Sequence, residues 1–207
     1  SIFNLIMEGG LGGQIIIALL FVLLMVGLYI YIERFLAIKA ASKIDKNYMN
    51  QIRDNISSGN LEAAKILSQN NRSPVARLIE IGISRIGKPL DDINKAIENA
   101  GKLEIYKLEK NVAVLATIAG AAPMIGFLGT VIGMIVAIHE IANSGGQIDI
   151  KMLSDGLYTA MTTTVAGLIV GIIAYIAYNH LIVRTNKVVY QMEANSLEFL
   201  DLLNEPV

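Results

Sequence analysis

The sequence is 207 residues long, carries a formal net charge of −1 and is 54% hydrophobic. A charge this close to zero excludes a general nucleic-acid binder, which would show a basic excess. The chain has no cysteine, and its two histidines, His139 and His180, lie far apart. A disulfide framework, a thiolate metal site and a short histidine metal motif are therefore excluded.

Three long apolar runs without Asp, Glu, Lys or Arg divide the chain, at residues 14–32, 112–138 and 157–183. A helix needs about 20 apolar residues to cross the hydrocarbon core of a bilayer, so each run predicts a transmembrane helix. The first run just meets that length, whereas the other two exceed it and should tilt, bend or extend beyond the hydrocarbon. No basic segment or cleavage signal accompanies the first run, so we expect a retained anchor and not a signal peptide.

The basic residues predict the orientation of these helices. Of the 17 Lys and Arg residues, 14 lie in the segment 33–111, two in the tail 184–207, one in the loop 139–156 and none in residues 1–13. Because loops rich in Lys and Arg stay on the cytoplasmic side, we expect a periplasmic N-terminus, a cytoplasmic helical domain, a periplasmic loop and a cytoplasmic C-terminal helix. The predicted fold is an all-α membrane protein with its N-terminus outside and its long helices extending into the cytoplasmic domain.

The predicted cytoplasmic segments are helical in pattern. Asn60 and Ser73 are suitable N-caps, and a proline follows Ser73 at the start of a helix predicted over 75–86. A further helix over 91–111 has no stop signal before the second span, which leaves open that the two are continuous. The C-terminal tail has a mostly apolar stripe, which we expect to pack beside the 91–111 helix. The stripe consists of Val189, Met192, Ser196, Phe199 and Leu203.

Small residues recur every three or four positions along the second and third spans. Helices in lipid associate through close packing, which small residues permit. Two interpretations stay open: the faces pack within one chain, or one face also packs against another subunit or a partner helix. Pro123 lies in the second span and is expected to bend that helix because it removes a backbone donor. The small residues are Ala119, Ala122, Gly126, Gly129 and Gly133, then Ala160, Thr164, Gly167, Gly171 and Ala174.

Hydroxyl side chains are the most suggestive polar groups inside the spans. Thr130 lies in the middle of the second span, and four threonines fall within six residues of the third: Thr159, Thr162, Thr163 and Thr164. A threonine in a membrane helix often bonds only to a carbonyl of its own helix, but such a cluster can also line a path for water or a cation. No Asp, Glu, Lys or Arg lies inside a span, so a proton relay would need a carboxylate from another chain. The alternative interpretation is that this protein moves no ion.

Residues 123–135, P-M-I-G-F-L-G-T-V-I-G-M-I, resemble the motif P-x-x-G-L-L-G-T-V-x-G-M of the ExbB/TolQ branch of the MotA/TolQ/ExbB proton channel family. Residues 157–168 resemble the third-span pattern A-L-x-x-T-x-x-G-L of that branch, and Tyr178 with Asn179 matches its Y-N pair. Three spans with the N-terminus outside also match this branch, whereas the flagellar branch has four spans.

This resemblance implies a homopentameric ring in the bacterial inner membrane, with a pore lined by second and third spans. Two single-span partners of the ExbD/TolR type would pass through the pore, each with one membrane Asp, and drive TonB- or TolA-like proteins. Thr130 and Thr164 match the family threonines proposed to face that Asp, and Pro123 matches the family proline. Thr159 stands where some members have a Glu, so this chain does not supply that carboxylate.

The expected function is that of a pore-forming, stator-type subunit of a motor driven by the proton motive force, without a cofactor. The hydroxyls of Thr130 and Thr164 would stabilise the ionised Asp of the partner, and protonation would release it. Threonine oxygens also suit Na⁺, so a Na⁺-coupled version stays open. Two rivals are a non-conducting membrane scaffold and a channel that conducts alone. No nucleophile–base pair, metal cluster or phosphate loop supports an enzyme.

Overall fold

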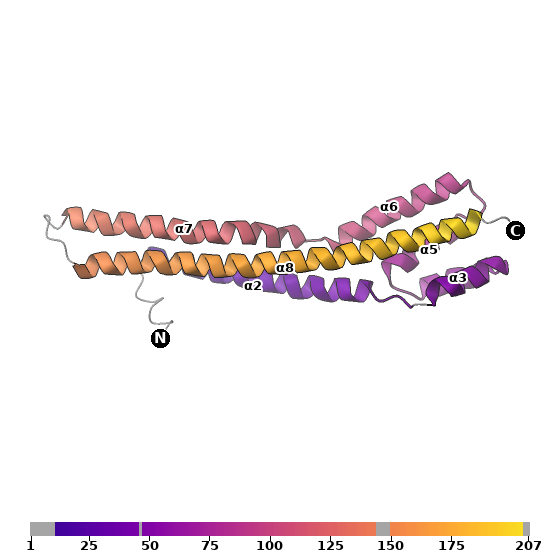
Figure 1. The fold of residues 1–207 in the computed structure, drawn as a ribbon, viewed down its shortest axis with the longest axis horizontal. Coiled ribbons are helices and arrows are strands. Elements are labelled where there is room, and N and C mark those ends of the chain that lie inside the picture. Colours follow the sequence, from indigo (N-terminus) through magenta and orange to yellow (C-terminus); the bar gives the residue numbers. More distant parts are fainter. Residues whose placement is uncertain (1–10, 46, 144–149, 205–207) are drawn as a thin grey trace. The chain divides into compact units, whose positions relative to one another are not determined.

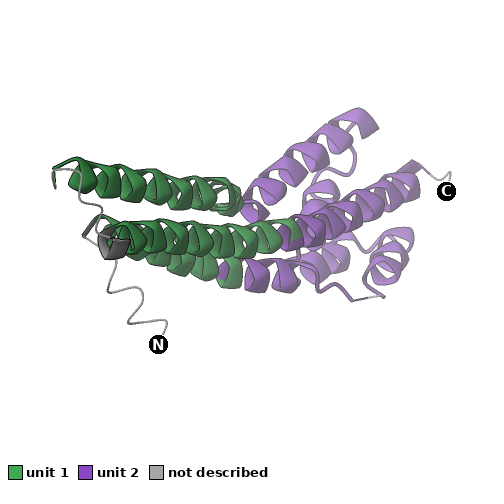
Figure 2. Ribbon diagram, turned by 60° about the vertical axis from the view of Figure 1, so that its left-hand side comes forward, with its two compact units in different colours: residues 1–32, 111–179 green, residues 33–110, 180–207 purple. Residues whose placement is uncertain are grey.

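The computed structural model describes residues 11–45, 47–143 and 150–204, and every regular element in these ranges is an α-helix. The chain divides into two compact units, one formed by residues 1–32 and 111–179 and the other by 33–110 and 180–207 (Figure 2). Two long helices contribute to both units. The helices are α2 (Leu11–Ala41), α3 (Tyr48–Ser57), α4 (Leu61–Gln69), α5 (Pro74–Ile83), α6 (Leu90–Leu108), α7 (Val112–Asn143) and α8 (Ile150–Asn204) (Figure 1).

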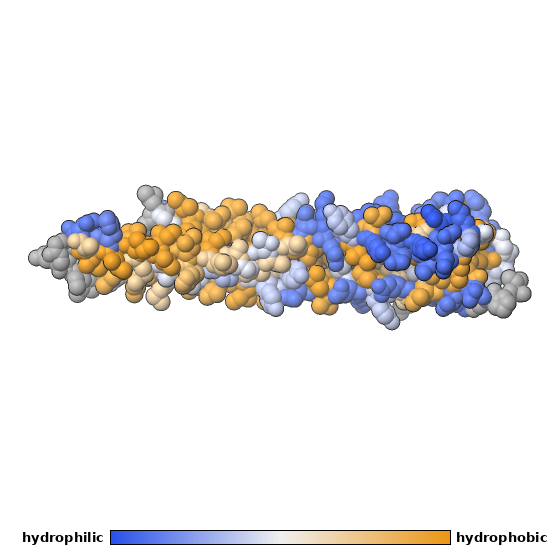
Figure 3. All heavy atoms as spheres, turned by 90° about the horizontal axis from the view of Figure 1, so that it is seen from above, coloured by the Kyte–Doolittle hydropathy of each residue, from blue (hydrophilic) through white to orange (hydrophobic). Residues whose placement is uncertain are grey.

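Unit 1 consists of the first part of α2, all of α7 and the first part of α8. Each of these helices is long and apolar enough to cross a membrane, as the three apolar runs predicted. Ile16, Leu20, Ile118, Ala122, Val170 and Ala174 form the core between them. Large apolar side chains also cover the outside of the unit (Figure 3), and Tyr29 and Met124 are 72% and 73% exposed. An exterior of this kind suits lipid or other apolar helices and is unusual for contact with water.

The helices of unit 1 alternate in direction. A Cβ built on Gly12 would contact Ile132, whereas one built on Gly27 would contact Ile118, so α2 runs antiparallel to α7. Helices α7 and α8 are antiparallel as well. The first and third spans therefore run in the same direction, as the predicted topology requires.

The helices extend beyond the apolar runs that predicted them. Helix α2 continues to Ala41, and α7 ends at Asn143, five residues beyond the predicted end of the second span. Helix α8 begins at Ile150, within the predicted 139–156 loop. Apolar runs mark the length that lipid requires, whereas helical hydrogen bonds continue through polar sequence as well. Residues 1–10 of the predicted periplasmic N-terminus, and 144–149 of the predicted loop, lie outside the described residues.

Helices α6 and α7 are not continuous. Helix α6 ends at Leu108, and Asn111 has a φ of 62°, in the left-handed region. Asparagine tolerates that conformation better than most residues because its short polar side chain bonds locally. A single residue of this kind redirects the chain, so the continuous helix that the sequence left open is wrong.

Unit 2 consists of α3 to α6, the end of α2 and the last part of α8. The predicted caps are confirmed, since Asn60 Oδ1 accepts from the Ala63 amide and Ser73 Oγ from the Ala76 amide, each at 3.2 Å. The helix after Ser73 ends at Ile83, earlier than the predicted residue 86.

The apolar stripe of α8 packs in the core of unit 2. Phe199 is fully buried, and a Cβ on Gly82 would come within 3.0 Å of its ring, so α5 approaches α8 closely at this glycine. A Cβ on Gly101 of α6 would lie 4.0 Å from the methyl group of Met192. The predicted packing of the tail beside α6 is therefore confirmed.

A buried hydrogen bond joins α3 to α4 in unit 2. Tyr48, 2% exposed, contacts the hydroxyl of Ser68 at 2.8 Å, and Ser68 donates to the Ala64 carbonyl at 3.0 Å. Because the serine proton is engaged, the tyrosine is the donor. Burial raises the pKa of Tyr48 to about 12, since the charged phenolate would lose its hydration.

Candidate functional site in the helix pair α7 and α8

The small residues of the second and third spans face each other across the α7–α8 contact. A Cβ built on Gly126 would lie 2.7 Å from the Thr163 carbonyl oxygen, and one on Gly167 would lie 2.5 Å from the Ala122 carbonyl oxygen. Real Cβ contacts are almost never shorter than 3.0 Å. The two backbones therefore touch directly at these glycines, which no larger residue would allow.

The same contact continues toward both ends of unit 1. Gly133 lies against Ala160, where a Cβ would be 3.3 Å from the alanine methyl. At the other end, Gly171 accommodates the ring of Pro123, whose Cγ would be 2.6 Å from an added Cβ. The structure thus uses the small residues for packing within one chain. Contact with another subunit stays an open prediction.

Pro123 lies inside α7, which remains helical on both sides of it. The proline cannot donate to the Ala119 carbonyl four residues earlier, and this oxygen would lie 3.1 Å from a Cβ on Gly171. An apolar groove of about 410 Å³ flanks the proline, and its lining includes Tyr175 and Tyr178 of α8. The bend predicted at Pro123 stays a prediction.

Thr130 and Thr164 form a reciprocal bridge between the two helices. Thr130 Oγ1 donates to the Ala160 carbonyl at 3.0 Å, and Thr164 Oγ1 donates to the Gly126 carbonyl at 3.2 Å. The two hydroxyl oxygens also contact each other directly. Each acceptor is the carbonyl four residues before the opposite threonine. Each hydroxyl therefore bonds to the acceptor that its counterpart would use if it bonded within its own helix.

The other threonines of the third span do not join this bridge. Thr159 and Thr162 donate to carbonyls of their own helix, those of Asp155 and Tyr158, both at 2.9 Å. Thr163 is fully buried, donates to the Ala160 carbonyl at 2.9 Å and packs against Gly129. Residues adjacent in a helical sequence point in different directions, so the cluster of four threonines does not form one polar face.

The bridge supplies hydroxyl protons and oxygen lone pairs, and no formal charge. The pair has two hydroxyl protons and three possible acceptors for them: the two carbonyl oxygens and the hydroxyl oxygen of the other threonine. Both protons are therefore engaged whichever acceptors they use. The backbone acceptors, Gly126 and Ala160, were not predicted as hydrogen-bond partners. Gly126 lies four residues before Thr130 and Ala160 four residues before Thr164, and this spacing could have identified both carbonyls as acceptors for a threonine hydroxyl. Within the described part of the chain, no group of His, Asp and Glu side chains could hold a metal ion.

Sequence comparison identifies relatives of this chain. A model of the MotA/TolQ/ExbB proton channel family matches residues 69–194. A putative biopolymer transport protein, an ExbB homolog of Methanothermobacter thermautotrophicus, is 27% identical over 173 residues, covering 81% of this chain and 61% of that protein. The biopolymer transport protein ExbB of Aquifex aeolicus is 33% identical over 118 residues, which are 56% of this chain and 77% of that protein.

A TolQ protein is also similar. The Tol-Pal system protein TolQ of Haemophilus influenzae is 36% identical over 94 residues, covering 45% of this chain and 41% of that protein. Against several such relatives the chain spans only 41% to 61% of their length. The family match includes the whole of α7 and the bridge residues in α8. The chain belongs to the MotA/TolQ/ExbB proton channel family, and its similarity is to the ExbB and TolQ branch.

Proposed function

We propose that this chain is a pore-forming, stator-type subunit of an inner-membrane motor driven by the proton motive force. It would assemble as a homopentameric ring, with α7 and α8 toward the pore and unit 2 in the cytoplasm. Two copies of an ExbD/TolR-like partner, each with one membrane Asp, would pass through the ring and drive a TonB- or TolA-like protein. The observation that carries the proposal is the Thr130–Thr164 bridge in spans that lack Asp, Glu, Lys and Arg.

The hydrogen bonds of the bridge suggest how it would treat a carboxyl group. With both hydroxyl protons engaged, the pair offers oxygen lone pairs, to which a protonated carboxylic acid can donate. An ionised carboxylate accepts only, so one hydroxyl would first have to leave its carbonyl on Gly126 or Ala160. The bridge would therefore accept one hydrogen bond from the neutral Asp, whereas a rotated hydroxyl would donate a stronger, charge-assisted hydrogen bond to the ionised Asp.

The ion gradient would act by changing the charge state of the Asp, because the two charge states differ in the free energy needed to leave the bridge. Burial of an ionised carboxylate in an apolar pore is costly, so the charged Asp would stay beside the bridge. Protonation would remove that cost and let the Asp pass the apolar wall to the next subunit. The membrane potential supplies about 2.3 kcal/mol per charge per 100 mV for each such step.

Protons are favoured over Na⁺ by the directions of the threonine side chains. A sodium site would need several oxygen atoms directed at one point. Thr159, Thr162 and Thr163 instead bond within their own helix and point in different directions, and only Thr164 joins the bridge. Replacing a pH gradient by a Na⁺ gradient in the assay below distinguishes the two ions.

The experiment uses proteoliposomes that contain the chain and its partner. Thr164→Val removes the bridge hydroxyl with little change in volume, Thr164→Ser keeps it, and Thr162→Val is the matched control because Thr162 bonds only within α8. We expect Thr164→Val to abolish gradient-driven proton flux, while the other two variants retain it and all three assemble. Unchanged flux in Thr164→Val would overturn the proposal.

The rival functions predict different results from the same preparations. A non-conducting scaffold predicts no flux from wild type and no effect of Thr130 or Thr164 substitutions on the assembled complex. A self-sufficient channel predicts flux from this chain without its partner. The small-residue contact favours neither rival, since it packs α7 against α8 in any of the three cases.

A further inference from the structure

Unit 2 has a basic groove between α5 and α6. It has a volume of about 450 Å³ and is lined by apolar residues that include Ala96 and Leu103, by the basic residues Arg85, Lys88 and Lys95, and by a single acid, Asp92. Within the described residues, none of the three basic side chains takes part in an ion pair. Leu103, which lines the groove, is 64% exposed. The groove thus combines unpaired positive charge with an uncovered apolar surface.

Helix α8 presents the complementary chemistry in the same unit. Tyr190, Glu193, Leu197 and Asp201 follow one another at spacings of three, four and four, so they form a stripe on one side of the helix. Tyr190 and Leu197 are 70% and 62% exposed, and neither acid takes part in an ion pair of the described residues. The stripe is therefore acidic and apolar. Glu193 and Leu197 border the groove between the chain's own α6 and α8, whereas Tyr190 and Asp201 are not part of its lining.

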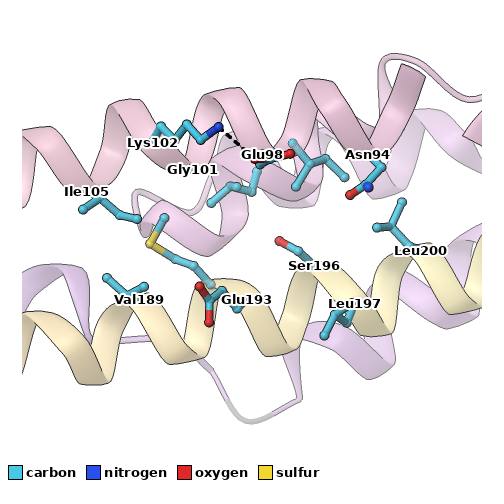
Figure 4. Close-up of a pocket in the computed structure, with 13 residues that line it drawn as sticks. Asn94, Glu98, Gly101, Lys102, Ile105, Val189, Glu193, Ser196, Leu197 and Leu200 are labelled. Carbon is cyan, nitrogen blue, oxygen red and sulfur yellow. Dashed lines mark ion pairs between the residues drawn. The ribbon is translucent and has the colours of Figure 1, made fainter. Parts of the chain in front are cut away.

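One chain cannot bring these two surfaces together. The residues of α6 that face α8, among them Gly101 and Ile105, lie on the opposite side of α6 from Ala96 and Leu103, and Lys95 lies at the edge between the two sides. Figure 4 shows the α8-facing side, where Ile105 lies across from Val189 and Lys102 bonds to Glu98 of its own helix at 2.8 Å. The basic groove thus faces away from the chain's own α8.

The two surfaces are level with each other along unit 2. Gly101 contacts Met192, and Ile105 lies across from Val189, so Leu103 is level with Tyr190 (Figure 4). Because α6 and α8 run in opposite directions, Lys95 is level with the turn that ends at Asp201. Copies related by rotation about an axis along these helices keep their levels, so a neighbouring copy would bring its stripe to the groove in register.

We propose that the basic groove of one copy receives the acidic stripe of α8 from the next copy of this chain. The contact rests on the proposed ring and specifies the surfaces that close it in the cytoplasmic unit. Leu103 packs against the neighbour's Tyr190, and Lys95 pairs with the neighbour's Asp201. Two different surfaces meet head to tail, and such a contact repeats around a ring instead of ending in a dimer.

The first test uses cysteine cross-linking, for which the chain has no cysteine background. Leu103→Cys and Tyr190→Cys are placed in separately tagged copies and expressed together. We expect an oxidised product that carries both tags, and only weak products when either variant is expressed alone. A disulfide between differently tagged chains cannot arise within one chain, so its absence from an assembled ring overturns the proposal.

The second test measures the dissociation of the ring on dilution by particle mass. Lys95→Glu or Asp201→Lys alone should raise the dissociation constant by about three- to ten-fold, and the two together should restore it. Lys43→Glu is the control, since this exposed lysine lines neither the groove nor the stripe and takes part in no ion pair of the described residues. A ring unaffected by Lys95→Glu overturns this contact and leaves the proposed function standing. A wild-type monomer overturns both.

Discussion

The close contact of α7 with α8 predicts a difference between two glycine substitutions in the same helix. Gly126→Ala places a methyl group 2.7 Å from the Thr163 carbonyl oxygen, 3.0 Å from Gly167 Cα and 3.2 Å from Thr164 Cα, all backbone atoms that cannot swing aside. Gly120→Ala places the same methyl group where no atom lies within 4 Å. Comparing Gly126→Ala with Gly120→Ala therefore separates the steric effect of the methyl group from the higher helix propensity that alanine brings to both positions.

The magnitude follows from these distances. Ordinary contact begins at 3.4 Å, so α7 and α8 must separate by about 0.7 Å at Gly126. That movement lengthens the 3.2 Å bond from Thr164 to the Gly126 carbonyl beyond hydrogen-bonding distance. Overpacking costs about 1–3 kcal/mol, and the two interhelical bonds contribute about 0.6 kcal/mol each in a membrane. Alanine favours a helix by about 1 kcal/mol over glycine, but that gain is common to both variants.

Gly126→Ala should therefore be about 2–4 kcal/mol less stable than Gly120→Ala. The assay is equilibrium unfolding of the purified protein in mixed detergent micelles, followed by circular dichroism at increasing SDS. Gly120→Ala should equal or exceed wild type in stability. Equal stability of the two variants, within about 0.5 kcal/mol, would show that α7 and α8 do not meet at Gly126 and would refute the reasoning.

Three further predictions concern unit 2 and its junction with α7. Ser73→Ala should lower the free energy of unfolding by about 1 kcal/mol in the same assay, because the Ala76 amide loses its cap. Tyr48→Phe should lower the free energy of unfolding by about 1 kcal/mol at neutral pH, and it should also make that free energy depend less on pH in the alkaline range. In wild type the unfolded phenol ionises near 10 and the buried phenol near 12, so stability should fall by up to about 3 kcal/mol as pH rises between these values, and this fall should be absent in the variant. Asn111→Gly should be close to neutral whereas Asn111→Val should destabilise by about 1–2 kcal/mol, because a β-branched residue resists a φ of 62°; equal stability of those two variants would contradict the assigned break between α6 and α7.

The sequence predicted what depends on composition and short-range pattern. The three apolar helices follow from runs of uncharged residues that are long enough for a bilayer, and the caps at Asn60 and Ser73 follow from side chains that can reach an amide three residues ahead. The contact of α7 with α8 was foreseeable because small residues spaced three and four apart fall on one side of a helix.

What the sequence could not specify depends on register. The bridge between Thr130 and Thr164 requires α7 and α8 to meet with Gly126 close to Gly167, a register that spacing along one helix does not define. The directions of the clustered threonines depend on the same register, since Thr163 points into the helix contact whereas Thr162 bonds to its own helix. The end of α6 is followed by the left-handed Asn111, and an asparagine after a helix with a lysine in its last turn is a stop signal that the sequence prediction missed.

The central claim is that this chain forms a ring around a partner that carries the titrating carboxylate. The most direct test is the particle mass of the chain in lipid nanodiscs, with and without a co-expressed single-span partner that contains a membrane Asp. The account predicts a five-fold ring that captures two partner chains, and loses them when the partner Asp is replaced by Leu. A monomer, or a ring that ignores the partner, would contradict it.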